Sequence, residues 1–242
     1  MAAFAPFAAF ARPLQFYLRE TGLNSPPLLS STASMKRILP IGFFLCIALL
    51  TVRAADSEAG FVTIFDGKTL NGWKVAEPEK KSWSIVDGVL VAHGETSHLF
   101  YVGDDQPFKD FELKVDVMTE PGANGGIYFH TKWQEKSWPK TGFECQVNVS
   151  HADYKKTGSI YDIANLGVTP AQDNKWWTQH IPVKGNTVQV RIDGKLVLEY
   201  KEPAGTQPGK DFTRKLNEGT FAFQAHDPKS VIRYKNVRVK RL

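Results

Sequence analysis

Residues 187–200 read TVQVRIDGKLVLEY, which is the clearest indication of the fold class in this sequence. Apolar and polar residues alternate on both sides of the Asp193-Gly194 pair, a preferred sequence for a two-residue turn between antiparallel strands. The stretch therefore predicts a β-hairpin with one apolar and one polar face. Its period of two does not produce the apolar stripe of a helix, which repeats about every 3.6 residues.

Similar short segments follow one another from Phe61 to the end of the chain, separated by Gly, Asn, Asp and Pro. The predicted strands are FVTIF, SWSIV, GVLVA, FELKVDVM, GGIYFH, FECQVNV, HIPVKG, TVQVRI, LVLEY, TFAFQAH and VIRYKNVRVKRL. No window has the period of an amphipathic helix, and no linker divides the region. Residues 60–242 are therefore expected to form one all-β domain, a two-sheet antiparallel sandwich of the jelly-roll type.

The first 54 residues differ in composition from the rest. Residues 1–34 are rich in Ala, Phe, Pro and Ser, and we expect a disordered leader or a misassigned translation start. Residues 35–54 contain a basic start, a short apolar run and small residues ending at Ala54, which are the three parts of a secretory signal. We therefore expect a periplasmic or secreted protein. An uncleaved anchor is the alternative, and it would be the protein's one contact with a membrane.

The basic balance of the chain belongs mostly to these first 54 residues. The whole chain has 30 Lys+Arg, 25 Asp+Glu and a net charge of +5. Without residues 1–54 it keeps 25 basic and 24 acidic residues, a net charge of +1. This near-neutral balance argues against a nucleic-acid partner. Cys145 is then the one remaining cysteine, so an intramolecular disulfide is excluded.

Three of the predicted strands carry polar side chains on one face. By alternation, the groups that share a face are Tyr128 with His130, Glu144 with Gln146 and Asn148, and Gln224 with His226. If the three strands are neighbours, they form one polar surface suited to sugar hydroxyls, with Glu144 and a histidine available for proton transfer. The alternative is an ordinary half-exposed sheet. The choice of Gln, Glu, His and Tyr rather than Lys, Thr and Ser favours a functional surface.

Two loops and one short segment could border that surface. Residues 133–142 carry two Trp, and residues 203–215 form a second polar loop; exposed aromatics in such loops often line a ligand groove. The two Trp could equally cap the edge of the core. Tyr161 and Asp162 could flank the polar face, or they could be a core tyrosine beside a turn carboxylate.

The remaining polar candidates give weaker signals. His93 and His98 are expected in a polar, solvated loop, and His151 with Asp153 is too small a set to indicate a metal site. Cys145 lies on the strand face opposite Glu144, as expected of a buried structural thiol. The sequence has no HExxH motif, EF-hand loop, phosphate-binding Gly-rich loop or GxSxG motif. We therefore expect no metal and no cofactor.

The order of several sequence blocks resembles that of the 3-keto-disaccharide hydrolase family. The blocks are FVTIFDGKTLNGWK, WSIVDGVLVA, FELKVDVMTEPGANGGIYFH, GFECQVNV, GSIYDI, KWWTQHIPVKGNTVQVRIDGKLV and GTFAFQAHDPKSVIRYKNVRV. The resemblance spans residues 60–242. It implies a concanavalin-A-like sandwich, a carbohydrate substrate, and action on glycosides already oxidised to a ketone at C3.

The resemblance also implies roles for particular residues. Glu144 and Gln146 are similar to the family's Glu-x-Gln, and Gln224 and His226 to its Gln-x-His. His226 or Glu144 is expected as the acid/base, and Gln146, Gln224 and Tyr128 are expected to orient hydroxyls. His130 stands where many members carry arginine, and for it we consider oxyanion stabilisation. Two other functions stay open, a non-catalytic carbohydrate-binding module and an inert surface protein.

Overall fold

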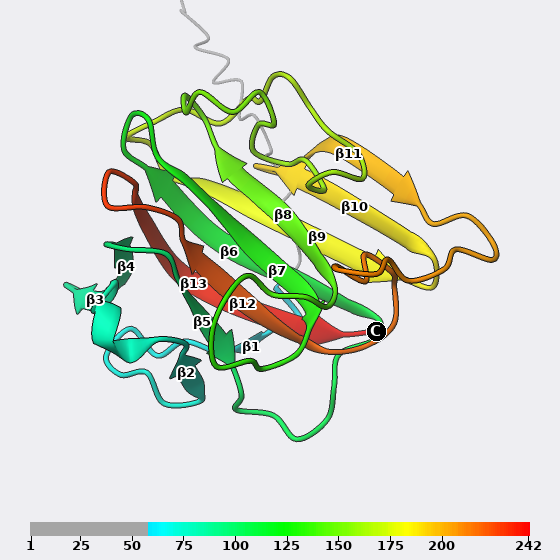
Figure 1. Ribbon diagram of the computed structural model, residues 1–242, viewed down its shortest axis with the longest axis horizontal. Helices are drawn as coiled ribbons and strands as arrows, with labels where there is room; N and C mark the ends of the chain where they lie inside the picture. Colours follow the sequence, from blue (N-terminus) through cyan, green and yellow to red (C-terminus); the bar gives the residue numbers. More distant parts are fainter. Residues whose placement is uncertain (1–57) are drawn as a thin grey trace, which may run out of the picture. The chain divides into compact units, whose positions relative to one another are not determined.

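The computed structural model describes residues 58–242, which form two antiparallel β-sheets (Figure 1). The predicted leader (1–34) and signal segment (35–54) lie outside the described residues. The larger sheet has the order β11 (Lys195–Lys201), β10 (Thr187–Ile192), β9 (Trp177–Lys184), β6 (Phe111–Thr119), β13 (Val231–Arg241), β4 (Val89–His93) and β3 (Trp83–Val86), with β1 (Val62–Thr63) also paired to β13. The smaller sheet has the order β2 (Trp73–Val75), β5 (Ser97–Tyr101), β12 (Thr220–Ala225), β7 (Asn124–Thr131) and β8 (Phe143–Asn148).

The hairpin predicted for residues 187–200 is present. Ile192 pairs with Lys195 across the β10–β11 turn, and the two turn residues have φ angles of 49° and 79°. Positive φ at both central residues is the type I′ geometry that Asp-Gly favours, because its twist matches that of the strands. The only helical segment among residues 58–242 is a single 3-10 turn, Pro78–Lys80. No helix in this range is long and apolar enough to cross a membrane.

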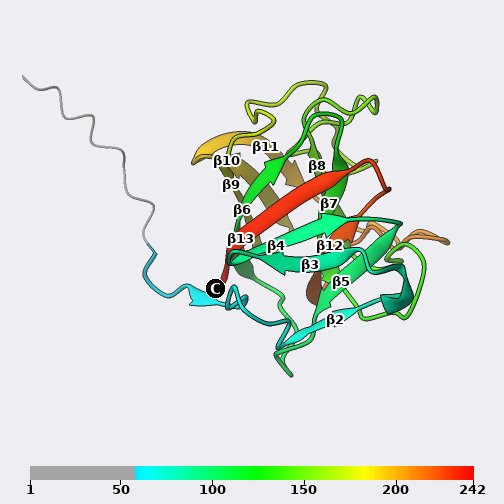
Figure 2. The same ribbon diagram turned by 90° about the vertical axis from the view of Figure 1, so that its left-hand side faces the viewer.

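The core lies between the two sheets, which Figure 2 shows side by side as two layers. Phe223 of β12 stacks on Tyr234 of β13, with ring centroids 4.5 Å apart and planes 6° apart. Burial of the Phe223 ring contributes about 1.5–3 kcal/mol to folding. Cys145 is buried in this core as a free thiol, and burial raises its pKa to about 12. The thiol therefore stays protonated, as expected of a structural cysteine.

The smaller sheet is covered on its outer face as well. Every residue of β7 and β8 is buried, although one face of each strand points away from the core. Loop residues supply the cover: Trp133 packs edge-on against Phe100, with ring centroids 5.3 Å apart, and closes a small apolar cluster with Ala76 and Ala222. The structure thus confirms the all-β antiparallel sandwich and leaves a partly covered polar face on the smaller sheet.

Strands β2 and β5 were not predicted. Residues of β5, SHLFY, are buried at every position, so their sequence lacks the alternation that marks a half-exposed strand. The expectation that His98 lies in a solvated loop is therefore wrong: it lies in β5 and is fully buried. His93, the last residue of β4, is exposed.

Candidate active site

Strands β12, β7 and β8 are neighbours, which is the condition that the sequence left open. Tyr128 lies opposite Glu144 in the β7–β8 register, and Gly126 lies opposite Gln146. Ala222 of β12 pairs with Tyr128, so that Gln224 comes beside β7 two residues further along. The structure thus brings Tyr128, Glu144, Gln146 and Gln224 together on the outer face of the smaller sheet, where they line one cavity.

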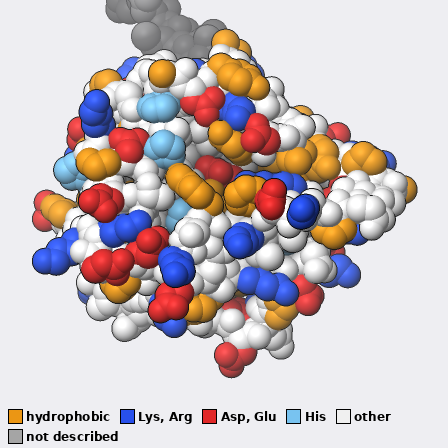
Figure 3. Space-filling model, viewed as in Figure 1, with side chains coloured by type: hydrophobic (Ala, Val, Ile, Leu, Met, Phe, Trp, Pro, Cys, Tyr) orange, Lys and Arg blue, Asp and Glu red, His pale blue; other side chains and the backbone are white. Residues whose placement is uncertain are grey.

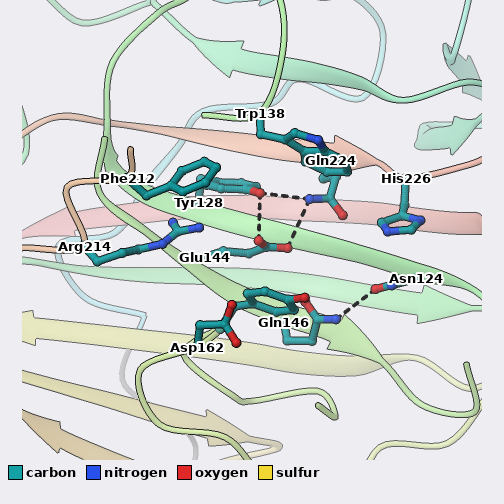
Figure 4. A pocket seen from close by; sticks show the side chains of 11 residues that line it. Asn124, Tyr128, Trp138, Glu144, Gln146, Asp162, Phe212, Arg214, Gln224 and His226 are labelled. Carbon is teal, nitrogen blue, oxygen red and sulfur yellow. Dashed lines mark hydrogen bonds between the residues drawn. The ribbon is translucent and has the colours of Figure 1, made fainter. Parts of the chain in front are cut away.

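Glu144 is the centre of this cavity. Its Oε2 accepts a hydrogen bond of 2.7 Å from the Tyr128 hydroxyl, and its Oε1 accepts one of 3.1 Å from Gln224 Nε2 (Figure 4). The side chain is almost completely buried, with 6% of the residue exposed. Burial raises the pKa of Glu144, although the Tyr128 hydrogen bond and the charge of Arg214 act in the opposite direction. A carboxylate in this environment is a stronger base than one in water.

The donors around Glu144 are well suited to hold it. Burial, with the neighbouring Glu144, raises the pKa of Tyr128 well above its usual range, so its hydroxyl remains a donor. Gln224 Nε2 also donates to the Tyr128 hydroxyl, at 2.9 Å. Gln224 also lines the cavity, and its Oε1 is buried without a hydrogen-bond partner among residues 58–242.

Gln146 and Asn124 extend the polar floor. Gln146 Nε2 donates to Asn124 Oδ1 over 2.9 Å. In the opposite amide orientation the Gln146 nitrogen lies 3.2 Å from Glu144 Oε1 and 3.2 Å from the Gly125 carbonyl. The opposite orientation therefore lets the Gln146 amide nitrogen donate to Glu144, and the residue also lines the cavity.

Gly126 makes room for the Glu144 side chain. A Cβ built at Gly126 would overlap Oε1 and the terminal carbons of Glu144. Gly126 lies within β7, where a glycine weakens the strand because it has no side chain to pack. The close approach of the Glu144 side chain leaves no room for a Cβ at this position unless the carboxylate shifts.

His226 lies at the end of β12, beside the cavity. Its Nδ1 is 2.7 Å from Asp227 Oδ2, and this carboxylate also accepts a 2.8 Å hydrogen bond from the Ser230 hydroxyl. Burial opposes ionisation of Asp227, but the hydrogen bonds from His226 and Ser230 outweigh it and hold its pKa below the usual value. An ionised Asp227 orients the imidazole and leaves Nε2 for a ligand.

Three loop side chains form the rim: Trp138 from the 132–142 loop, and Phe212 and Arg214 from the loop between β11 and β12. Trp138 and Phe212 are 38% and 39% exposed. They border a cavity of about 360 Å³. Figure 3 shows this face of the molecule, where a hollow lies between hydrophobic side chains and histidines. Both loops border the cavity as the sequence predicts, but nothing in the sequence singles out Phe212 or Arg214.

Tyr161 and Asp162 also line the cavity, and Figure 4 shows Asp162 on the side opposite Trp138. The Tyr161 backbone N–H donates to the Glu144 carbonyl over 2.9 Å, which fixes this segment along the edge of β8. Lys155 Nζ lies 2.7 Å from Asp162 Oδ1 and 3.8 Å from the centre of the Tyr161 ring. The two residues thus flank the polar face as predicted, and the alternative of a core tyrosine is excluded.

His130 does not line the cavity, and its predicted place on the Tyr128 face is wrong. Alternation fails because His130 has a φ of 53°, which turns the strand at this residue. Its ring packs edge-on against Phe111, and Nε2 lies 2.9 Å from the Lys109 carbonyl. Burial lowers the pKa of His130. An oxyanion role for this residue is therefore excluded by its position.

Two other predicted polar residues have structural contacts instead. Asn148 Nδ2 donates to the carbonyls of Asp153 and Lys155, at 2.9 Å each, and so closes the loop after β8. His151 Nδ1 accepts a 3.1 Å hydrogen bond from the Asp153 backbone N–H. Within residues 58–242, no group of three or more His, Cys, Asp and Glu side chains gathers as metal ligands would.

His98 is the polar residue beneath the site that the sequence reasoning missed. Its ring lies edge-on to Tyr128 and to Trp138, with centroid distances of 5.5 and 5.4 Å. Neither ring nitrogen has a hydrogen-bond partner. Burial lowers the pKa of His98 to about 3, so the imidazole is neutral. His98 pairs with Gln224 in the β5–β12 register, so a correct prediction of β5 would have placed His98 beside the site.

Fold and site together define a class: a concanavalin-A-like β-sandwich with a buried carboxylate in a loop-bordered cavity. The chain belongs to the family described as the 3-keto-alpha-glucoside-1,2-lyase-like domain, whose sequence model matches residues 60–240. The curated 3-keto-disaccharide hydrolase of Bacteroides thetaiotaomicron is 35% identical over 170 residues, covering 58% of this chain. This chain spans 58% of the length of that relative.

Solved structures agree with the fold. Two candidate glycosyl hydrolases from Parabacteroides distasonis superimpose with TM-scores of 0.64 and 0.59, at 24% and 25% identity. The first match covers 76% of this chain and 94% of that protein, and the second covers 75% and 99%. A Bacillus subtilis protein of unknown function with a galectin-like fold has a TM-score of 0.53 at 11% identity, covering 75% of this chain and 94% of its own.

Proposed function

We propose that this protein is an enzyme that cleaves glycosides whose C3 hydroxyl has been oxidised to a ketone. The observation that carries the proposal is Glu144, a carboxylate with a raised pKa, buried without an ion pair among neutral hydrogen-bond donors. The relative named a 3-keto-disaccharide hydrolase and the lyase-like family supply the class of substrate. The near-zero net charge of residues 55–242 and the amide side chains that line the cavity are consistent with a sugar ligand.

A C3 ketone makes the hydrogen on C2 acidic, which determines the chemistry. A base removes the C2 proton, and the electron pair is delocalised onto the C3 oxygen as an enolate. The pair then forms the C1–C2 double bond as the bond from C1 to the aglycone oxygen breaks, and the leaving oxygen takes up a proton. Water subsequently adds across C1 and C2, with hydroxide on C1 and a proton on C2, to give the free 3-keto-sugar.

The cavity offers a residue for each proton transfer. Glu144 is the proposed base, because desolvation strengthens it and its hydrogen bonds keep it in place. His226 is the proposed acid for the leaving oxygen, with Asp227 holding Nδ1 so that Nε2 faces the ligand. Tyr128, Gln146 and Gln224 orient the hydroxyls of the sugar.

The test is turnover of 3-keto-trehalose and 3-keto-lactose by the purified protein. We expect product with at least one of them, and a loss of at least ~100-fold in kcat for Glu144→Gln, the range typical of a general base. The matched control is Glu199→Gln, an exposed carboxylate of β11 that should keep full activity. No turnover of any 3-keto-glycoside, or full activity in Glu144→Gln, would contradict the proposal.

Elimination and direct hydrolysis can be separated in heavy water. Elimination followed by hydration places deuterium on C2 of the product, because the proton that leaves C2 is replaced from solvent. Direct displacement at C1 leaves the C2 hydrogen untouched. We expect one deuterium per product molecule at C2, read by NMR or mass spectrometry. Product with an intact C2 hydrogen would exclude the elimination route.

A non-catalytic carbohydrate-binding module is the second candidate, favoured by the exposed Trp138 and Phe212 at the cavity rim. Exposed aromatic rings at a pocket are common in ligand binding without chemistry. Tight glycan binding without product, and with no change in Glu144→Gln, would support this alternative over catalysis.

We also propose that the protein is exported to the periplasm or secreted. The support is the signal-like pattern of residues 35–54, which lies outside the described residues. N-terminal sequencing of the exported protein should begin just after Ala54. An intact mass that includes residues 1–54 would contradict export with cleavage.

A further inference from the structure

Arg214 is a cationic side chain that lines the cavity but takes no part in the proposed proton transfers. It lies in the loop between β11 and β12 and lines the cavity beside Phe212. Figure 4 shows its guanidinium pointing toward Glu144 from one side of the carboxylate, while His226 lies on the other side. The three groups thus surround the place where a ligand would meet the buried base.

Most N–H donors of the Arg214 guanidinium have no partner in the described part of the chain. Its Nη1 donates to the Gly142 carbonyl over 3.3 Å, and this is the one hydrogen bond the structure gives it, whereas a guanidinium has five N–H donors. Its central carbon lies 5.0 Å from the centre of the Phe212 ring. Within residues 58–242, no carboxylate reaches ion-pair distance of Arg214. A cation that is stacked but unpaired in a cavity is suited to bind an anionic or strongly polarised ligand atom.

The loop holds Arg214 in this position through its neighbour. The Thr213 N–H donates to the Lys140 carbonyl over 2.9 Å, and the Thr213 hydroxyl accepts from the Gly142 N–H over 3.2 Å. These bonds tie the two rim loops together. Arg214 itself has a φ of 40°, a conformation that a residue with a side chain adopts only where its surroundings impose it. The backbone at Arg214 is therefore held in place, and the side chain is positioned by its contacts with the Gly142 carbonyl and the Phe212 ring.

The charge of Arg214 acts on the buried groups. It lowers the pKa of both Glu144 and Tyr128, against the larger effect of burial. Arg214 and Glu144 form no ion pair and both line the cavity, so a ligand bound there can approach both groups. A ligand atom that becomes negative between them would be stabilised by the guanidinium at short range and in a partly desolvated setting.

We propose that Arg214 binds the C3 ketone oxygen of the substrate and stabilises the enolate that forms when Glu144 removes the C2 proton. This inference rests on the proposed function and assigns the oxyanion role that His130 does not fill. It also orients the sugar ring, with C3 toward Arg214 and the bond from C1 to the aglycone toward His226. Arg214 would bind the ketone weakly in the ground state and the enolate oxygen strongly, so its main effect is on kcat.

The test compares Arg214→Lys and Arg214→Ala with the wild type on a neutral 3-keto-glycoside. We expect kcat to fall roughly 10²–10³-fold in Arg214→Ala, the range found when one oxyanion donor is removed, with a much smaller change in KM. Arg214→Lys should retain more activity, because it keeps the charge. Added guanidinium ion, at concentrations that do not unfold the protein, should restore part of the activity of Arg214→Ala and none of that of Glu144→Gln. Arg191→Ala, on the remote strand β10, is the control and should remain active.

Each outcome decides between named possibilities. If the wild type turns over no 3-keto-glycoside, the proposed function fails and this inference fails with it. If the wild type and Arg191→Ala are active and Arg214→Ala keeps kcat within about threefold, only the role of Arg214 is overturned. A loss confined to substrates with a C6 carboxylate would assign Arg214 to recognition of substrate charge and would also overturn the proposal. Thermal unfolding of each variant shows whether it is folded.

Discussion

Tyr128 and Glu144 lie directly opposite each other in β7 and β8, and the Tyr128 hydroxyl donates to Glu144 Oε2 over 2.7 Å. The pair places a neutral donor and a carboxylate at fixed positions, because both side chains project from paired strands rather than from loops. Burial favours the protonated form of each group, while the hydrogen bond favours the ionised form of Glu144. The balance between these two effects sets the pH at which the base becomes active.

The first prediction concerns that balance. Tyr128→Phe removes the hydrogen bond that lowers the pKa of Glu144, so the pKa rises further and the acidic limb of kcat/KM moves to higher pH. We expect kcat to fall at least about tenfold, because the carboxylate loses the hydroxyl donor that holds it in position for the reaction. The measurement is the pH profile of kcat/KM for both proteins. Tyr154→Phe, which alters an exposed tyrosine, should leave the profile unchanged, and an unmoved acidic limb in Tyr128→Phe would refute the argument.

The second prediction tests the space beneath the carboxylate. Gly126→Ala introduces a Cβ that overlaps the end of the Glu144 side chain, so the carboxylate must move out of its hydrogen bonds with Tyr128 and Gln224. We expect activity to fall ~100-fold or more, as displacement of a reacting group by about 1 Å does. Gly167→Ala is the matched control, because nothing lies within 4 Å of a Cβ there. Equal activity in the two variants would show that Glu144 tolerates displacement.

The third prediction links function to stability. Glu144 has a raised pKa in the folded state, so the folded protein binds this proton more tightly than the unfolded chain does. Its contribution to stability is therefore fully present below the ordinary glutamate pKa and is lost as the pH rises through the folded-state pKa. Glu144→Gln removes this loss, and we expect it to raise Tm at neutral pH while it abolishes activity.

Gln224 makes that substitution compatible with the site. Its Oε1 has no partner, so rotation of its amide can accept a hydrogen bond from the nitrogen that Glu144→Gln introduces. A rise of about 2 °C or more in Tm, corresponding to ~1 kcal/mol in a domain of this size, should appear at neutral pH and shrink in acid. Glu199→Gln serves as the exposed control. A Tm below that of the wild type at every pH would contradict the expectation.

The fourth prediction concerns acid sensitivity at His98. Burial lowers its pKa from the ordinary 6.5 to about 3, with Glu77 acting in the opposite direction and Lys80 and His226 adding to the effect. As the pH falls from 6.5 toward 3, the unfolded chain gains a proton there that the folded protein does not, so stability is lost. His98→Phe keeps an aromatic ring against Tyr128 and Trp138 and should flatten the decline of Tm in acid. His93→Phe, at an exposed position, should show the wild-type decline; equal slopes in the two variants would exclude His98 as a source of acid sensitivity.

The sequence predicted the polar face well because it depends on alternation within regular strands. Tyr128, Glu144 and Gln224 needed only a period of two and the assumption that their strands are neighbours. His130 departs from the alternation because its φ angle is positive, and a histidine in the sequence gives no indication of such a backbone angle. His98 was missed because β5 is buried on both faces and so has no alternation. Arg214 depends on the bonds of Thr213 to a loop some seventy residues earlier, and such long-range contacts leave no local pattern.

The last prediction separates the rim from the catalytic floor. Trp138 is 38% exposed, and the centre of its ring lies 5.7 Å from that of His226 and 5.4 Å from that of His98. The ring therefore closes one side of the cavity, and it makes no hydrogen bond to Glu144. If the ring serves as an apolar surface for the sugar, its loss weakens binding of substrate and transition state alike, and KM rises with little change in kcat. We expect Trp138→Ala to raise KM roughly tenfold, corresponding to ~1.4 kcal/mol. Trp176→Ala, whose ring stacks with Lys235 away from the cavity lining, is the control and should leave both constants unchanged. A fall in kcat at constant KM would instead show that Trp138 positions His226 for proton transfer.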